Sequence, residues 1–368
     1  MDLRTLLSDT VAGHRLTPSE GLRLIEATGR DVLAIAAAAD EVREERVGNR
    51  VTYVRNQNLH VTNVCKNLCG FCGFGKAKGA AGTYLFGRDE VQRKARLAVA
   101  RGVTEICPLS GVHPDFTVES YVDLIGWIHE IAPAVDIHTC SPEEVSYVAG
   151  KAGLSTPEVL GRMREAGLGT LQGTAAEILV DEVRAVICPR KCDTATWLRV
   201  IREAHEMGIR STATIMYGAG ESGTDRITHL DLLRGVQDAT GGFTELVPMS
   251  WVYQNTPLYR AGMASPGATG REDVLMIAVA RLYLDNFDHI QVSWGKVGPK
   301  MVSMLLLSGG DDLGGTMFED EVSVDAGAGE AAYMDPAAMA RIATDLGRGL
   351  CRRSTTYELL DEEPAVLA

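Results

Sequence analysis

The sequence is poor in aromatic residues and in positive charge. Phe, Trp and Tyr make up 6% of the 368 residues, whereas hydrophobic residues make up 45%. That balance suits an α/β protein rich in Ala, Val, Leu and Gly better than an all-β protein. Lys and Arg total 36 against 49 Asp and Glu, so the net charge is −13. Because nucleic-acid binding needs a surplus of Lys and Arg to neutralise phosphates, we expect no nucleic-acid partner and a small-molecule substrate.

Long apolar runs are also missing. No stretch approaches the roughly 20 apolar residues that cross a bilayer. The first twenty residues, MDLRTLLSDTVAGHRLTPSE, lack the continuous apolar core of a signal peptide. We therefore expect a cytoplasmic protein with no membrane partner. In that reducing compartment, clustered thiols are more often metal ligands or redox centres than disulfides.

From residue 51 onward the sequence alternates short apolar runs with segments of helical period. The apolar runs predict strands at 59–62, 105–109, 134–138, 170–171, 211–216, 243–248 and 290–294, with a candidate eighth at 301–307. The segments between them predict helices at 88–101, 118–131, 141–150 with 157–166, 176–187, 194–207, 224–240 and 271–286. Strands that alternate with helices imply a parallel sheet, and eight of them favour a (β/α)8 barrel of the α/β class over an open doubly wound sheet.

Three parts of the chain are expected. Residues 1–50 predict an N-terminal helical extension, with Ser19 and Asp31 as N-caps, that packs against the outside or bottom of the barrel. Residues 51–330 predict the barrel itself, and residues 331–368 a C-terminal helical segment. Since barrel enzymes place their chemistry at the C-terminal ends of the strands, the residues that follow each strand are the candidates for a site.

Three of the eight cysteines, Cys65, Cys69 and Cys72, directly follow the first predicted strand. Their spacing is C-x3-C-x2-C, and no second C-x2-C pair completes a four-ligand structural zinc site. Thiolates from one short loop can instead hold three irons of a 4Fe-4S cluster and leave the fourth open to a substrate or cofactor. Zinc and purely structural cysteines remain the alternatives at this point.

The C-x3-C-x2-C spacing with an aromatic residue before its last cysteine resembles the signature of the radical S-adenosylmethionine superfamily. The resemblance implies a barrel fold and a 4Fe-4S cluster on Cys65, Cys69 and Cys72. It implies S-adenosylmethionine as a second cofactor, bound to the open iron and cleaved to a 5′-deoxyadenosyl radical when the cluster is reduced. It also implies an electron donor such as flavodoxin or ferredoxin.

Further segments resemble one subgroup of that superfamily. They are GTAAEILVDEVRAVICP, STATIMYG, TGGFTELVP, NTPLY, IQVSW and DDLGGTMFED. The subgroup contains the deazaflavin-forming synthase subunit, aminofutalosine synthase and dehypoxanthine futalosine cyclase, and GTAAEI favours the deazaflavin branch. The resemblance implies cleavage of the Cα–Cβ bond of L-tyrosine and transfer of its 4-hydroxybenzyl fragment to 5-amino-6-(D-ribitylamino)uracil.

The same resemblance implies cofactor-binding residues after three strands. They are Ser110, Gly111 and His113 after the second strand, Glu177 after the fourth and Glu221 after the fifth. A glycine lets the backbone approach a ligand closely, although SGVHP also fits an ordinary turn. Glu177 also fits a carboxylate that stabilises a helix N-terminus.

Catalytic and substrate-binding candidates complete the expected site. His138 ends the third predicted strand and is either a proton shuttle or a structural histidine. Tyr53 and Arg55 are the other catalytic candidates. A ribityl chain and a uracil need polar partners, and a phenol needs a flat apolar wall. The substrate-binding candidates are Gln291, Ser293, Trp294, Lys296, Asp311, Asp312 and Thr316, the last three in a glycine-rich loop expected after strand eight.

Three places near the expected mouth depart from the wording usual in the subgroup. LSGVHP, with Ser110, replaces QGGxHP, Thr139 and Cys140 replace Ala and Phe, and Ala219 replaces His. One alternative is therefore a related radical enzyme of this subgroup with another substrate. The other is an iron–sulfur protein that only transfers electrons, for which the cluster would need a fourth protein ligand.

Overall fold

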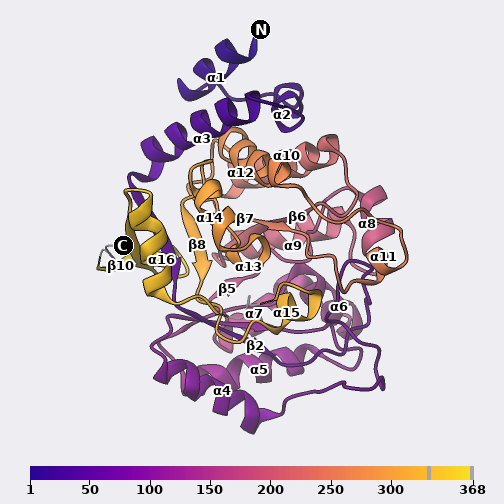
Figure 1. Ribbon diagram of the computed structural model, residues 1–368. Coiled ribbons are helices and arrows are strands. Elements are labelled where there is room, and N and C mark those ends of the chain that lie inside the picture. Colours follow the sequence, from indigo (N-terminus) through magenta and orange to yellow (C-terminus); the bar gives the residue numbers. More distant parts are fainter. Residues whose placement is uncertain (330–332, 365–368) are drawn as a thin grey trace.

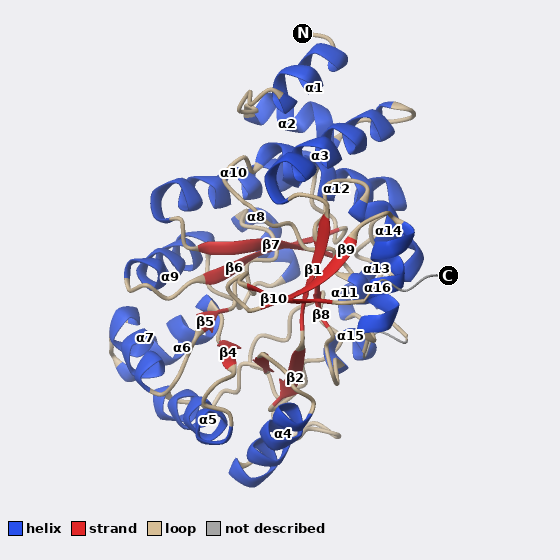
Figure 2. Ribbon diagram, turned by 90° about the vertical axis from the view of Figure 1, so that its left-hand side faces the viewer, coloured by secondary structure: helices blue, strands red, loops and turns tan. Residues whose placement is uncertain are grey.

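The computed structural model describes residues 1–329 and 333–364. Its helices surround a ring of strands, as Figure 2 shows. The strands are β1 Arg50–Val54, β2 Asn56–His60, β3 Glu105–Leu109, β4 Asp136–Thr139, β5 Thr170–Leu171, β6 Ser211–Tyr217, β7 Phe243–Ser250, β8 Asp312–Gly315, β9 Gly349–Arg353 and β10 Leu359–Glu362. The helices are α1 Leu3–Val11, α2 Pro18–Ile25, α3 Asp31–Val47, α4 Arg88–Ala100, α5 Val118–Ile131, α6 Pro142–Ala152, α7 Thr156–Glu165, α8 Asp181–Ile187, α9 Thr194–Glu206, α10 Gly223–Thr240, α11 Pro257–Arg260, α12 Gly270–Tyr283, α13 Trp294–Val297, α14 Pro299–Leu306, α15 Glu321–Ala326 and α16 Pro336–Asp345.

The strands close into a parallel barrel. Six of them pair in the order β2-β3-β4-β5-β6-β7, and β8 pairs in parallel with β1. Parallel bridges close the ring; they join Leu246 to Ile290, Gln291 to Asp312 and Gln57 to Phe318. Since β1 and β2 follow one another with only Arg55 between them, they act as one wall of the ring. The predicted (β/α)8 architecture is confirmed.

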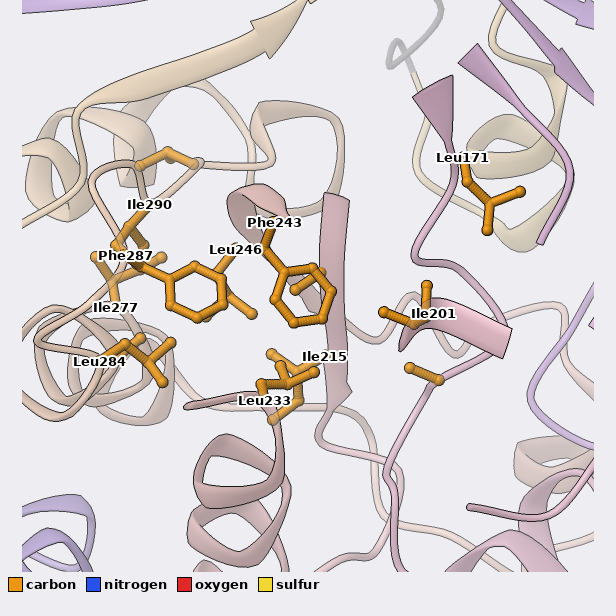
Figure 3. Packing of buried hydrophobic residues seen from close by; sticks show 14 of the residues in the cluster. Leu171, Ile201, Ile215, Leu233, Phe243, Leu246, Ile277, Leu284, Phe287 and Ile290 are labelled. Carbon is orange, nitrogen blue, oxygen red and sulfur yellow. The ribbon is translucent and has the colours of Figure 1, made fainter. Parts of the chain in front are cut away.

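The hydrophobic core lies between the outer face of the barrel and the helices. Figure 3 shows Ile215 of β6 and Phe243 of β7 near Leu233 of α10, with Ile277 of α12 at the other side of the same cluster. All four side chains are buried. Parallel strands that are covered on both faces have nearly continuous apolar sequences. Most of the strands could therefore be predicted from the sequence.

The N-terminal extension packs on the outside of the barrel. Figure 1 shows α1, α2 and α3 on the side of α10 and α12, and α3 contacts α12 while α2 contacts both α10 and α12. Arg46 of α3 donates to the carbonyls of Asp285 and Phe287 at 2.6 and 2.8 Å. The predicted helices and their placement are therefore confirmed.

Two predicted helix caps in this extension were wrong. Thr17, not Ser19, caps α2, because its hydroxyl accepts from the Glu20 N–H in a capping box while Ser19 lies inside the first turn. Asp31 is the first residue of α3, and the N-cap position belongs to Arg30, which makes no side-chain cap.

The predicted eighth strand at 301–307 was also wrong. That run forms α14, in which Val302, Leu305 and Leu306 are buried at helical spacing. A short apolar run does not by itself distinguish a strand from a buried helix. The ring is completed by β8 instead, and the predicted helix at 176–187 is helical only from Asp181.

The C-terminal part closes the N-terminal end of the barrel. Its predicted helical character holds for α16 only, since β9 pairs in parallel with β1 and β10 pairs with β9. The buried Arg353 of β9 donates to Asp312 at 2.9 Å and lies 3.4 Å from a carboxylate oxygen of Glu245. Burial raises the pKa of Glu245, and Arg353 opposes the rise. The division into 1–50, 51–330 and 331–368 stays a prediction, and residues 330–332 and 365–368 lie outside the described residues.

Candidate active site

The three close cysteines lie in a long segment between β2 and α4, here called the cysteine loop, residues 61–86. Its backbone is held by segments that follow other strands or helices. The bonds run from Lys66 N to Val112 O at 2.8 Å, from Gly70 N to Ile187 O at 2.9 Å, from Leu258 N to Gly70 O at 2.8 Å and from Trp251 Nε1 to Phe71 O at 3.0 Å. Val112 and Trp251 follow β3 and β7, so the loop lies across the C-terminal ends of the strands, as predicted.

The thiols of the cysteine loop lie near one another, because besides burial the charge of Cys72 affects the pKa of Cys69 and the charge of Cys65 affects the pKa of Cys72. Cys69 is buried, and the Cys72 N–H donates to the Cys69 carbonyl at 3.1 Å. Burial raises the pKa of Cys72, and the nearby Cys65 thiol adds to the rise. Among the residues described, no three His, Cys, Asp or Glu side chains are grouped as ligands of one metal ion. The cysteines of an iron–sulfur cube bind three different irons and need not converge in that way.

The segment that follows β3, here called the wall and including Ser110 and Gly111, packs closely against the cysteine loop. A Cβ on Gly111 would lie 2.3 Å from the carbonyl oxygen of Val64 and 3.0 Å from Cβ of Cys65. The adjacent Ser110 hydroxyl is buried and has no hydrogen-bond partner among the described residues. A buried hydroxyl left without a partner costs free energy unless a ligand satisfies it. This wall therefore fits a polar cofactor bound beside the thiols.

The segment after β5 contributes one member of a charged pair that lies near Cys69. Ala175 and Glu177 have φ values of 66° and 47°, a left-handed conformation that is strained for residues other than glycine. The buried Glu177 carboxylate forms an ion pair with Lys191. Burial lowers the pKa of Lys191, but Glu177 and the thiols of Cys69 and Cys188 raise it well above its usual range. Glu177 and Lys191 thus face Cys69.

The other two cofactor candidates are engaged within their own turns. The Glu221 carboxylate accepts from the backbone N–H groups of Gly218 and Ala219 at 2.7 and 2.9 Å and from Arg226 Nε at 2.8 Å. The ring of His113 stacks on Phe116 with centroids 5.0 Å apart. Ala219 itself packs in one apolar cluster with Cys69 and Trp251, so the turn of Glu221 borders the site.

A cavity of about 1410 Å³ opens beside the cysteine loop. Its lining includes Trp251, Tyr253, Trp294, Lys296 and Arg341, but no cysteine. We place the chemistry at the cysteines, since thiolates are what an iron site requires, and regard the cavity as adjoining space. Trp251 joins the two, because it lines the cavity and donates to the cysteine loop.

The predicted substrate residues divide into three groups. Trp294 and Lys296 line the cavity, whereas Gln291 and Ser293 are buried in the barrel wall, where the Ser293 hydroxyl donates to Pro248 O at 2.8 Å. Thr316 is also buried and belongs to this second group, since its hydroxyl donates to Asn56 O at 3.0 Å at the C-terminal end of β8. Asp311 and Asp312 form the third group and lie elsewhere.

Placing Asp311 and Asp312 in a loop after strand eight was wrong, because they precede and begin β8. They therefore lie at the N-terminal end of the barrel, away from the cysteine loop. Asp311 binds Arg281 at 2.6 Å and His289 at 2.7 Å. Asp312 binds Arg353, as described above. Both carboxylates hold the closed end of the barrel together.

The three catalytic candidates do not meet the thiols. His138 points into the barrel, where Nδ1 lies 2.8 Å from the Thr170 hydroxyl and burial lowers its pKa. The Tyr53 hydroxyl donates to Glu363 near the C-terminal strands. Arg55 Nε donates to the carbonyl of Arg101 at 2.7 Å. Their catalytic roles stay predictions, and their contacts are those of structural residues.

Comparison with known proteins agrees with this site. The family model described as the radical SAM superfamily matches residues 59–233, and the model described as the CofH/MqnC C-terminal region matches residues 240–363. A protein of Methanoculleus marisnigri named 5-amino-6-(D-ribitylamino)uracil–L-tyrosine 4-hydroxyphenyl transferase is 61% identical over 358 residues, 97% of this chain and 98% of that protein. The chain belongs to the radical SAM superfamily.

Other relatives of this radical SAM chain extend the comparison. The FO synthase of Mycobacterium tuberculosis is 42% identical over 97% of this chain, which spans 42% of that longer protein. Among solved structures, the [FeFe]-hydrogenase maturase HydG matches with a TM-score of 0.73 at 17% identity, covering 96% of this chain and 76% of that one. Methylornithine synthase (PylB) matches with a TM-score of 0.68 at 18% identity, covering 86% and 87%. These structures support the fold.

Within residues 1–329 and 333–364, every helix is too short or too polar to be a membrane span.

Several residues of this radical SAM site were missed from the sequence. Lys191 lies between Cys188 and Cys192, outside the segments from which site residues were predicted. Lys66 and Glu143 form an ion pair at 2.8 Å, and Glu143 also accepts from the Cys192 N–H at 2.6 Å. These contacts join segments that are far apart in the sequence, so no local pattern reveals them.

A buried histidine supports the segment that carries Glu177. His229 of α10 accepts from the Leu179 N–H at Nδ1 and donates from Nε2 to Thr214 O, both at 3.0 Å. Burial lowers its pKa from 6.5 to about 3. In the unfolded chain the ring takes up a proton near pH 6.5, but in the folded chain only near pH 3. The stability that this neutral ring contributes is therefore complete above pH 6.5 and is lost as the pH falls toward 3.

We expect His229 to make the free energy of unfolding about 1 kcal/mol lower at pH 5.5 than at pH 7. The measurement is urea unfolding of the metal-free protein at both pH values, for the wild type and for His229→Gln, which retains a donor and an acceptor. The variant should lose less stability on acidification than the wild type. Asp136, whose pKa burial raises to about 6, changes stability in the opposite sense but is present in both proteins. Equal losses in the two proteins would contradict the expectation.

Proposed function

We propose that this chain is a 5-amino-6-(D-ribitylamino)uracil–L-tyrosine 4-hydroxyphenyl transferase. It would cleave the Cα–Cβ bond of L-tyrosine and transfer the 4-hydroxybenzyl fragment to the uracil. The observation that carries the proposal is the 61% identity with the Methanoculleus marisnigri transferase, which extends over 97% of the chain. The match covers 97% of the chain, which is the reason for taking the reaction of the relative as the proposal for this site.

The cofactor proposal rests on the thiols and on the wall beside them. Cys65, Cys69 and Cys72 hold a 4Fe-4S cluster. When bound there, the cluster and S-adenosylmethionine supply a 5′-deoxyadenosyl radical. Ser110 offers a free hydroxyl to the cofactor, and Gly111 keeps the wall close to the cysteine loop. Glu177 offers a carboxylate to hydroxyl or amino groups, whereas the cofactor roles of His113 and Glu221 stay predictions.

The adjoining cavity supports binding of the two substrates. Trp251, Tyr253 and Trp294 supply flat apolar surface for an aromatic ring, and Lys296 and Arg341 supply donors for polar groups. Lys296 is held in place by Ser323 and lies 3.8 Å from an Asp320 oxygen. The apolar wall excludes water from one side of a bound ring, and the cations orient the polar end.

One alternative has a specific observation in its favour. Cys140 and Ala219, two of the residues that depart from the subgroup's usual wording, are buried at the C-terminal ends of β4 and β6. Smaller or different groups there change the shape of the site. A related radical enzyme with another substrate is therefore the second candidate, and an electron-transfer protein is the third.

The test is an anaerobic assay of iron–sulfur-reconstituted protein with dithionite, S-adenosylmethionine, L-tyrosine and 5-amino-6-(D-ribitylamino)uracil. We expect 5′-deoxyadenosine together with a uracil adduct whose mass includes the 4-hydroxybenzyl fragment. Replacing tyrosine by phenylalanine should lower adduct formation about tenfold or more, because a partner of the phenol is left unpaired. Dithionite stands in for the natural donor, for which flavodoxin or ferredoxin stays a prediction.

The outcomes separate the three candidates. 5′-Deoxyadenosine without a tyrosine-derived adduct favours the related enzyme with another substrate. Protein that carries the cluster but never cleaves S-adenosylmethionine favours the electron-transfer protein. Formation of the adduct with tyrosine, and much less with phenylalanine, supports the transferase.

A further inference from the structure

The turn that carries Glu177 is buried although it belongs to no helix or strand. Residues 175–179 lie between β5 and α8 and are all at most 5% exposed. Buried backbone carbonyls in such a turn need hydrogen-bond donors from elsewhere, because no regular ladder supplies them. The Glu177 carbonyl accepts from Met216 N at 2.9 Å, and Thr174 O accepts from Trp197 Nε1 at 3.1 Å.

Three other carbonyls of this turn are bound by one side chain, Arg184 of α8. Nη1 donates to the carbonyls of Ala175, Ala176 and Ile178 at 3.2, 2.5 and 3.4 Å. Nη2 donates to Ala175 O at 3.2 Å and to Cys192 O at 2.5 Å. The guanidinium is buried, with the residue 4% exposed. Within the described part of the chain, every hydrogen bond of Arg184 goes to a backbone carbonyl.

The two segments that Arg184 joins are those that carry the charged pair. One holds Glu177 in its strained backbone conformation, and the other ends at Cys192, next to Lys191. Strained residues persist only where their surroundings fix them. The planar fork of an arginine can bind carbonyls on two segments at once, whereas the single ammonium of a lysine cannot span them in the same way. Arg184 therefore fixes where Glu177 and Lys191 stand relative to Cys69.

We propose that Arg184 is a positioning residue for the S-adenosylmethionine site, acting through the turn of Glu177 and the segment of Lys191. The inference rests on the cofactor role proposed for Glu177. It does not depend on which second substrate the enzyme uses. Arg184 does not line the cavity, and its side-chain hydrogen bonds go to backbone carbonyls, not to Cys65, Cys69 or Cys72.

The test compares Arg184→Lys with a matched control, Arg234→Lys. Arg234 of α10 is also buried and donates to the carbonyls of Leu16 and Tyr283 at 2.9 and 3.3 Å, but it binds the N-terminal extension. Amide hydrogen exchange in metal-free protein is read for 175–179 and 188–192. After reconstitution, we measure the iron content. We also measure KM and kcat for S-adenosylmethionine in the formation of 5′-deoxyadenosine.

For Arg184→Lys we expect amide exchange in both segments to become about tenfold faster. We expect KM for S-adenosylmethionine to rise about tenfold, kcat to stay within about threefold of the wild type, and the iron content to be unchanged. Arg234→Lys should leave exchange in these segments, KM and iron content as in the wild type. Unchanged exchange and KM in Arg184→Lys overturn the proposal. A rise of KM in Arg234→Lys as large as that in Arg184→Lys also overturns it. Loss of iron in Arg184→Lys overturns it too, because Arg184 would then support the cysteine loop instead.

A second variant covers the case in which Arg184→Lys does not fold. Glu177→Gln keeps the contacts of Arg184 with the turn, so exchange in 175–179 should stay as in the wild type while KM for S-adenosylmethionine rises about tenfold. An unchanged KM in Glu177→Gln overturns the proposal. Because 5′-deoxyadenosine formation needs no uracil adduct, these results are independent of whether the proposed transferase activity is found.

Discussion

Replacing any one of Cys65, Cys69 and Cys72 by alanine is expected to abolish cluster loading and 5′-deoxyadenosine formation together. Loss of one thiolate leaves two irons without a protein ligand, so the iron that should bind the cofactor is no longer distinct. Iron and sulfide content, the visible absorption of the reconstituted protein and its electron paramagnetic resonance spectrum report the cluster. Chromatography of the reaction mixture reports 5′-deoxyadenosine.

Cys188→Ala is the matched control for these variants. Cys188 is buried in the same apolar cluster as Cys69 but lies outside the cysteine loop. It should keep the wild-type cluster content, as should alanine variants of Cys107, Cys140, Cys192 and Cys351. A Cys65, Cys69 or Cys72 variant that retained both the chromophore and cofactor cleavage would refute the ligand assignment.

Gly111→Ala is expected to disable the site without removing a ligand. The added Cβ would lie 2.3 Å from the oxygen and 2.8 Å from the carbon of the Val64 carbonyl. Both atoms belong to the backbone, so the cysteine loop must move to make room. Overpacking of this kind costs about 2 kcal/mol or more. We expect a lower melting temperature of the metal-free protein and less than half of the wild-type iron content after reconstitution.

Gly126→Ala serves as its control. Gly126 lies within α5, and a Cβ placed there meets no atom within 4 Å. This variant should match the wild type in iron content and should be no less stable, because alanine favours a helix more than glycine does. Normal iron loading in Gly111→Ala would show that the cysteine loop does not depend on its close contact with the wall after β3.

The features predicted correctly from the sequence are mainly those that depend on residues close together in the chain. The cysteine motif identified the radical SAM superfamily because its three cysteines stand close together in the sequence. The strand at 105–109 and the helix at 118–131 agree with β3 and α5 residue for residue, because their apolar patterns are regular. The barrel followed from the alternation of such elements.

Features that depend on distant residues were missed. The run at 301–307 is apolar in either conformation, and its packing against the rest of the protein selects a helix. That error moved Asp311 and Asp312 to the wrong end of the barrel. Arg184 stands in a quoted motif and Lys191 lies two residues beyond its end. Their importance comes from their positions beside Cys69 and the turn of Glu177, which only the folded chain brings together.

The pairing of β9 with β1 bears on the order in which the molecule folds. Arg50 pairs with Gly349, so this part of the sheet forms only after roughly 300 residues have been brought back to the start of the barrel, a slow kind of contact. The cysteine loop depends on later segments too, since its backbone bonds go to Val112, Ile187 and Leu258. Until those segments arrive, the three cysteines are separate thiols on an unfinished chain, open to oxidation. A cluster on these cysteines would therefore assemble only on a nearly complete barrel, and the speed of folding sets how long the thiols stay exposed.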